Sequence, residues 1–244
     1  MTDVMARVQK HYDRAVEHYG ANAVLGVFLY GSWNYNTNTP DSDVDTKCIL
    51  IPNLHSLAIK PYETKHLSID DEVCECMTIM HMVANWKKQN VNFVEIMFTD
   101  YCIINPLYKD LWEKLLPAEL RERVARYDLR QTIHFMAHQA IHTLKQNPED
   151  PKKVMNGVRI ANTISRVVST DLPYRECIWM DEKVRENRFR TPDPKLVESL
   201  VLIFEDYLVC VDDYKAEKYE QVRVDLSLET LILKLIEYRI TELW

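Results

Sequence analysis

Leu29-Tyr30-Gly31-Ser32, followed by a polar loop and then by Asp41-Ser42-Asp43-Val44-Asp45, is the stretch that decides the fold. The apolar run ahead of it, residues 24–30, predicts a buried strand that ends on the glycine and the serine. Glycine is scarce here, with 4 in 244 residues, so a glycine that closes a strand is expected to have a backbone role. We therefore expect a ligand to approach the main chain closely at this point.

Two carboxylates begin the second strand, which is predicted over residues 44–51. Successive side chains of a strand point to opposite faces, so Asp43 and Asp45 are expected to share one face. Like charges this close repel each other, and a bound cation would relieve the repulsion. Magnesium prefers hard carboxylate oxygens and usually keeps water and substrate phosphates as further ligands. The pattern thus indicates a metal-dependent site for a nucleoside triphosphate.

The Gly-Ser pair, a spacer of about ten residues and the Asp-x-Asp segment resemble the signature of the DNA polymerase β-like nucleotidyltransferases. The stretch is most similar to predicted nucleotidyltransferases of bacteria and phages that are sometimes encoded beside RNA ligases. The resemblance is strong over residues 20–55, weaker to about 100, and beyond 115 rests on one basic helix. It implies an α+β fold: a mixed sheet with flanking helices, followed by a C-terminal helical bundle.

The same resemblance implies a division of the chain and a set of metal ligands. Residues 1–115 would form the nucleotidyltransferase domain, and residues 116–244 a helical domain that closes the cleft. Asp43, Asp45 and a third carboxylate on a neighbouring strand would hold two Mg²⁺ ions, with Mn²⁺ as a substitute. Glu75 is the predicted third ligand, inside a strand predicted over 70–79. Glu72 is the alternative, and the odd spacing puts the two on opposite faces.

A phosphate-binding set is predicted from two distant segments. Ser32, together with the Gly31 and Ser32 amides, would bind the β- and γ-phosphates, since oriented backbone N–H groups form an anion site. The same resemblance implies a helix that carries a lysine, a polar residue and an arginine at steps of three, and Lys153, Asn156 and Arg159 fit this spacing on a helix predicted from 151 to 169. Arginine suits a triphosphate through bidentate contacts, and lysine supplies a point charge. The alternative is a solvated helix face.

Other polar side chains receive structural interpretations. Glu95 is the one acid in the apolar run 91–98 and is interpreted as a paired or cap-bonded group. His134, His138 and His142 recur every four residues along one side of a helix, a spacing that zinc, interhelix packing or acceptor binding would all explain. No nearby Cys or Glu completes a zinc site. Packing is favoured over base stacking for Trp33.

The remaining segments are predicted mostly as helices. Residues 53–70 have little pattern and are interpreted as a mixed, largely solvated insertion. Helices are expected over 2–19, 78–89, 109–116, 119–145, 195–219 and 227–243.

Composition limits the classes of function. A net charge of −7 argues against broad electrostatic capture of nucleic acid, although a local basic groove is compatible with it. The six cysteines include no CxxC pair and are expected to be reduced. No apolar run approaches the length of a membrane span, and the charged N-terminal segment lacks a signal pattern, so we expect a cytoplasmic protein with no membrane contact.

These observations predict a nucleotidyltransferase that moves NMP from an NTP, such as ATP, to a hydroxyl or phosphate and releases pyrophosphate. The acceptor would be an RNA end, a protein or a small molecule. One alternative is a noncatalytic nucleotide- or partner-binding protein that keeps the fold. Another is a synthase of oligonucleotide second messengers. The sequence leaves the base, the acceptor and the oligomeric state open.

Overall fold

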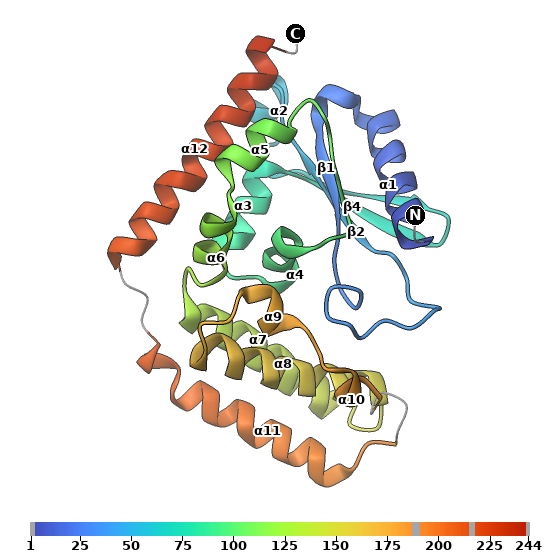
Figure 1. Ribbon diagram of the computed structural model, residues 1–244, viewed down its shortest axis with the longest axis vertical. Coiled ribbons are helices and arrows are strands. Elements are labelled where there is room, and N and C mark those ends of the chain that lie inside the picture. Colours follow the sequence, from blue (N-terminus) through green and yellow to red (C-terminus); the bar gives the residue numbers. More distant parts are fainter. Residues whose placement is uncertain (1–2, 187–190, 215–217, 243–244) are drawn as a thin grey trace.

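A computed structural model of the chain describes residues 3–186, 191–214 and 218–242, and its centre is a five-stranded sheet (Figure 1). The strands are β1 Val24–Leu29, β2 Thr46–Leu50, β3 Thr64–Ile69, β4 Glu72–Thr78 and β5 Cys102–Ile104. Their order across the sheet is β3-β4-β2-β1-β5. The β2–β4 pair is parallel and the other pairs are antiparallel, so the predicted α+β class and mixed sheet are confirmed.

Helices account for most of the rest of the described chain. They are α1 Asp3–Tyr19, α2 Leu54–Ile59, α3 Ile79–Lys87, α4 Val91–Val94, α5 Lys109–Leu115, α6 Ala118–Ala125, α7 Leu129–Gln146, α8 Pro151–Ser169, α9 Tyr174–Ile178, α10 Glu182–Arg185, α11 Pro194–Val209 and α12 Lys218–Glu242. Short 3₁₀ turns are η1 Ala21–Ala23, η2 Glu95–Phe98 and η4 Val211–Asp213.

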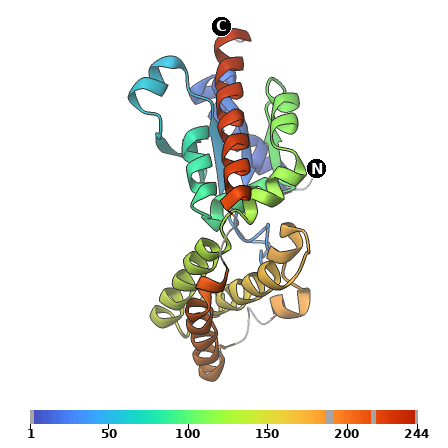
Figure 2. The same cartoon turned by 90° about the vertical axis from the view of Figure 1, so that its left-hand side faces the viewer.

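The two faces of the sheet are covered by different elements because its side chains alternate. One face packs against α1, where Val8 meets Val44 and Cys48 in a buried cluster. The other face packs against α3, α5 and α12, in a larger cluster that includes Leu25 and Met77. Figures 1 and 2 show α1 on one side of the sheet and α12 on the other.

A second group of helices lies at the far end of the long axis (Figure 2). Helices α7, α8 and α11 pack on one another around their own buried cluster, which includes Ile133, Ile160 and Phe204. Helix α8 is N-capped by Asp150, whose side chain accepts the backbone N–H groups of Lys152 and Lys153, and it begins on Pro151. A C-terminal helical region is therefore present, and α8 has the bounds that the sequence predicts.

Helix α12 follows this group in the chain and packs on the sheet. Its Leu228, Leu231 and Leu235 belong to the same buried cluster as Leu25 of β1. The division of the chain between residues 115 and 116 stays a prediction. The structure shows that α12, from the predicted second domain, packs on the sheet of the predicted first domain.

The predicted insertion at residues 53–70 is wrong in part, because it contains α2 and the edge strand β3. Only Leu67 of β3 is buried, so the strand carries almost no hydrophobic signal. It is held instead by its antiparallel ladder to β4, after a turn in which Asp70 has a φ of 53°. An edge strand with one side in solvent accepts Lys and His at positions where a central strand would not.

Two predicted helices have other bounds in the structure. The single helix expected over 119–145 is two, because Asp128 adopts an extended conformation and caps α7 by accepting the Gln131 N–H. The helices expected over 195–219 and 227–243 are α11 and the longer α12, so the break falls before residue 218 rather than near 220–226. In the first case an apolar periodicity continues across the break, and the Asp128 cap marks where α7 begins.

We predict that Leu235→Ala lowers the free energy of unfolding by about 2–5 kcal/mol, because it removes a fully buried side chain between α12 and the sheet. Leu233→Ala is the matched control on the same helix, since Leu233 is 66% exposed, and should change stability by less than ~0.5 kcal/mol. Urea denaturation measures both. Equal effects would contradict the packing of α12 described above.

Candidate functional site

The Gly-Ser turn and the Asp-x-Asp segment are joined directly by the backbone. The Tyr30 N–H donates to the Asp45 carbonyl at 3.1 Å, which extends the β1–β2 pairing by one step beyond the strands. The indole N–H of Trp33 donates to the Asp43 carbonyl, also at 3.1 Å. The predicted start of the second strand is slightly wrong, because β2 begins at Thr46 and both aspartates precede it. The backbone of both aspartates therefore lies beside the turn.

Asp43 and Asp45 interact as like charges. Asp43 is exposed and Asp45 is half-buried. Burial raises the pKa of Asp45, and the neighbouring charge of Asp43 raises it further. A divalent cation between the two would remove this penalty, so this pair fits the expected metal.

Glu72 acts on the backbone of the aspartate segment from the other face of the sheet. Its carboxylate accepts the Val44 N–H at 2.8 Å and pairs with Arg7 of α1. Arg7 also donates to the Ser42 carbonyl, and His11 is within 3.3 Å of the second Glu72 oxygen. These contacts hold the chain between the aspartates against α1. Glu72 is thus a structural neighbour of the site rather than a metal ligand.

Glu75 lies on the face of the sheet that Asp43 and Asp45 share. It is the register partner of Lys47 on β2, and Lys47 follows Asp45 by two residues. The Lys47 ammonium, however, forms an ion pair with Glu75. Among residues 3–186, 191–214 and 218–242, no group of three His, Cys, Asp or Glu side chains is arranged to hold a metal ion. The residues fit one cation at the two aspartates, and they do not fit a site with three free carboxylates.

A pocket of about 230 Å³ brings the two predicted phosphate-binding segments together. Its lining consists of Gly31, Ser32, Tyr35, Thr37, Asn92, Gln139, Lys152, Lys153, Met155, Asn156 and Arg159. Every phosphate-binding residue predicted from the sequence is in this set. The lining contains three cationic side chains and no carboxylate. Within the described part of the chain, none of the three cations makes an ion pair, so the pocket is a local basic site in an acidic protein.

Arg159 is the most deeply placed cation of the pocket. It is 6% exposed, and its guanidinium carbon lies 3.8 Å from the centroid of the Tyr35 ring. Its Nε donates to the Asn156 side-chain oxygen at 3.0 Å, whereas the buried Nη1 makes no hydrogen bond within the described structure. A buried donor without an acceptor is costly. The charge of Arg159 also lowers the pKa of the buried Glu95 carboxyl, so the guanidinium acts on that group as well as on the pocket that it lines.

The Gly31 amide is already engaged, which corrects part of the predicted phosphate site. Gly31 adopts a φ of +90°, and its N–H donates to Glu95 Oε1 at 2.9 Å. Glu95 is fully buried in η2, so the amide points into the protein rather than toward a phosphate. The positive φ explains the need for glycine here. Ser32 is left as the polar side chain of this turn that lines the pocket.

Glu95 has an unusual environment for a carboxyl group. Burial raises its pKa from 4.5 to about 7, even though Tyr35, the Gly31 N–H, Arg159 and Lys47 all lower it. The interpretation of Glu95 as a hydrogen-bonded structural group is confirmed by its bond to Gly31. Its second oxygen, Oε2, makes no hydrogen bond of good geometry within the described structure.

The loop between β1 and β2 is held against the helical group by the segment that follows α9. The Met180 N–H donates to the Tyr35 carbonyl at 3.0 Å, and the Asn36 side chain donates to the Met180 carbonyl at 2.9 Å. Arg166 of α8 in turn donates to the Trp179 carbonyl at 2.7 Å. Arg166 thus has a structural role. The pocket is closed on this side by direct bonds rather than by apolar contact alone.

The three histidines of α7 do not assemble a metal site in the described structure. His134, His138 and His142 are exposed, and the first two rings are 4.3 Å apart between centroids. None belongs to a group that would hold a metal among the residues described. Trp33 packs edge-on against Tyr101 with ring centroids 6.2 Å apart, which agrees with the packing interpretation.

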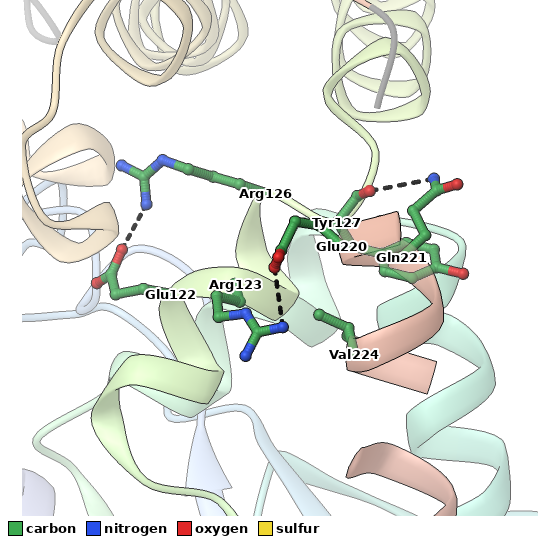
Figure 3. A pocket seen from close by; sticks show the side chains of 7 residues that line it. All are labelled: Glu122, Arg123, Arg126, Tyr127, Glu220, Gln221 and Val224. Atoms are coloured by element: carbon green, nitrogen blue, oxygen red, sulfur yellow. Dashed lines mark hydrogen bonds and ion pairs between the residues drawn. The ribbon is translucent and has the colours of Figure 1, made fainter. Parts of the chain in front are cut away.

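A second pocket, of about 290 Å³, lies between α6 and the start of α12 (Figure 3). Its two arginines are already neutralised: Arg126 pairs with Glu122 and Arg123 pairs with Glu220. The Gln221 side chain donates to the Tyr127 carbonyl at 3.2 Å. Because its charges are satisfied internally, this pocket lacks the free positive charge that a polyphosphate requires.

All six cysteines are free thiols, as predicted. None of the described helices combines the length and apolar character required for crossing a membrane. The chain matches no protein-family model, and no curated protein matches it.

Several residues of the site were missed from the sequence. Lys47 had a signal, because it continues the alternation of Asp43 and Asp45 on the same face. Gln139 comes from α7 and carries no signal in the sequence, since only the packing of α7 on α8 brings it to the pocket.

We predict that Glu95→Gln flattens the dependence of stability on pH. The folded pKa of Glu95 is raised above the unfolded value, so the folded state binds the extra proton and stability falls as pH rises from 4.5 to about 7. The full effect of this group is at most about 3 kcal/mol. The free energy of unfolding in urea, measured from pH 5 to pH 8, gives the slope.

Glutamine keeps an oxygen that accepts the Gly31 N–H, so the variant should fold. Glu119→Gln, at an exposed position on α6, is the control and should leave the slope unchanged. An identical slope in wild type and Glu95→Gln would show that Glu95 is not the titrating group.

Proposed function

We propose that this protein is a metal-dependent nucleotidyltransferase with the DNA polymerase β-like nucleotidyltransferase fold. It transfers NMP from an NTP, such as ATP, to a hydroxyl or phosphate of an RNA end, a protein or a small molecule. The proposal is supported most by one observation: the pocket joins Ser32 to Lys153, Asn156 and Arg159. The family resemblance and phosphate chemistry together point to these residues, which come from two segments more than a hundred positions apart.

The charge of the pocket suits a triphosphate. Lys152, Lys153 and Arg159 present three positive charges to a concavity that no carboxylate lines. Arg159 would donate to two phosphate oxygens from its planar fork, and its stacking on Tyr35 fixes the orientation of that fork. Ser32 and Asn156 add neutral donors. The backbone of Asp45 is bonded to Tyr30, two residues before Ser32, which supports a position of the two acids near the reacting phosphate.

In the reaction, the acceptor oxygen forms a bond to the α-phosphorus, and the bond from that phosphorus to the bridging oxygen breaks. The electron pair leaves with pyrophosphate, and the proton of a hydroxyl acceptor is released to solvent. A Mg²⁺ or Mn²⁺ ion held by Asp43 and Asp45 would neutralise charge on the phosphates. The residues of the pocket orient the triphosphate so that pyrophosphate lies toward α8. Most of the barrier reduction in such a site comes from positioning and charge neutralisation.

The Lys47–Glu75 ion pair favours a second candidate function, that of a noncatalytic nucleotide-binding protein. A carboxylate that is paired with a lysine does not act as a free metal ligand, and a noncatalytic nucleotide-binding protein would tolerate that pairing. Such a protein would bind NTP in the same pocket and release no pyrophosphate. The two functions therefore differ in turnover and agree in binding.

We predict that Asp43→Asn combined with Asp45→Asn lowers Mg²⁺-dependent pyrophosphate release by at least ~100-fold, because the charge on the phosphates is no longer neutralised. The melting temperature should stay the same or rise, since Asp43 is exposed and burial already penalises the charge of Asp45. The assay uses each NTP with a cell extract as the source of acceptor.

Asp41→Asn is the matched control, because Asp41 is an exposed acid in the same segment. It should keep full turnover. Equal turnover in the wild type and the double variant would remove the metal assignment. NTP binding without turnover in the wild type, over all acceptors tried, would favour the noncatalytic protein.

We also predict that Lys153→Ala weakens NTP binding by about 5–10-fold and Arg159→Met by about 10–100-fold, because each removes a charge-assisted contact to phosphate. Isothermal titration with a nonhydrolysable NTP measures the affinity. Lys145→Ala is the control: Lys145 is an exposed lysine on α7 outside the pocket. Unchanged affinity in both pocket variants, with folding intact, would mean that the triphosphate binds elsewhere.

A further inference from the structure

Lys47 is a buried cation on the face of the sheet where a metal ion is expected. It is 2% exposed, and its ammonium lies 4.2 Å from the centroid of the Tyr30 ring and 4.1 Å from that of Phe93. The same ammonium is paired with Glu75. Two aromatic rings and one carboxylate therefore fix its position. A lysine rarely occupies such a place without a role, since burying its charge is costly unless it is paired.

The strand register puts Lys47 between the acids. Lys47 is directly opposite Glu75 across the parallel β2–β4 pair, and Asp45 lies two residues before it on the same face. Its charge also favours the ionised forms of Asp45 and of Glu95, which lie near it on other sides. One ammonium thus faces carboxylates from β4, from the segment before β2 and from η2.

The charges of the site balance with a single metal ion. The predicted metal ligands Asp43, Asp45 and Glu75 carry three negative charges when ionised, and Lys47 carries one positive charge. Glu95 is not counted as a ligand because its carboxyl group is bonded to the Gly31 N–H. The remainder is two negative charges, which one divalent cation neutralises. A second divalent ion would need Glu75 as a ligand, but Glu75 is committed to Lys47 and the ammonium has no lone pair to offer.

We infer that Lys47 serves as a built-in cation in place of a second metal ion, so that this chain binds one divalent ion, at Asp43 and Asp45. This inference rests on the proposed function for the identity of the site, and it differs from the two-ion site that the sequence resemblance implies. Lys47 is a positioning residue here: it holds Glu75 and keeps that carboxylate away from metal.

The test counts bound Mn²⁺ per chain by electron paramagnetic resonance titration of the full-length protein without nucleotide. The wild type should bind one ion, and Asp45→Asn should bind none. Lys47→Met frees Glu75 and should bind two. The double variant Lys47→Met with Glu75→Gln removes both charges of the pair and should return to one ion with an affinity within about threefold of wild type.

Circular dichroism and thermal melting check folding, and Lys60→Met, at an exposed position on the same domain, is the matched control and should bind one ion. Two ions in the wild type would overturn the inference, as would loss of the single ion in the double variant or one ion in a folded Lys47→Met. If Lys47→Met does not fold, the number of Mn²⁺ ions bound by the wild type and by the double variant still tests the inference.

The metal count and the turnover of NTP are separate readouts, so the two proposals fail in different ways. Two bound ions with pyrophosphate release would overturn the role of Lys47 and leave the nucleotidyltransferase standing. One bound ion with no NTP binding would overturn the proposed function and leave the metal count. Absence of Mn²⁺ binding in the wild type would overturn the role of Lys47, and pyrophosphate release would still decide the proposed function.

Discussion

The hydrogen bond from the Tyr30 amide to the Asp45 carbonyl is the contact on which the site depends. It continues the antiparallel pairing of β1 and β2 past the ends of both strands, so the loop between them leaves and returns at one point. This hydrogen bond joins the two parts of the candidate site. Ser32 follows Tyr30 on one side of the bond, and the segment with Asp43 and Asp45 lies on the other. The alternation of side chains separates roles on β4, with Glu75 toward the site and Glu72 toward α1.

Much of the fold is readable from the sequence where local signals agree. β1 and β2 are apolar runs that end in turn residues, and α8 has an acidic cap and a proline at its start. Signals fail where tertiary contacts decide the structure. β3 exposes most of its side chains and exists because β4 offers it a ladder. The break before α7 depends on one capping aspartate, Asp128, inside a continuous apolar pattern.

The candidate site divides in the same manner. Ser32 and Arg159 could be predicted because the family resemblance supplies the motif and phosphate chemistry restricts the choice of donors. Spacing does not show which groups are already bonded within the protein. The Gly31 amide donates to Glu95, and Glu75 forms an ion pair with Lys47. Both pairings cross between elements that are distant in the chain. A sequence motif therefore predicts the groups that would contact a substrate better than it predicts the bonds that those groups make with other residues of the protein.

The return of α12 to the sheet has a consequence for how the molecule forms during synthesis. Leu25 and Leu231 belong to one buried cluster although they are separated by most of the chain. Until α12 is synthesised, the part of this apolar face that α12 covers stays exposed beside α3 and α5. Contacts of such long sequence separation close slowly, and a nascent chain that waits with an exposed face is prone to aggregation. Because α12 comes after all the other elements in the chain, we expect the nascent protein to need chaperones during translation.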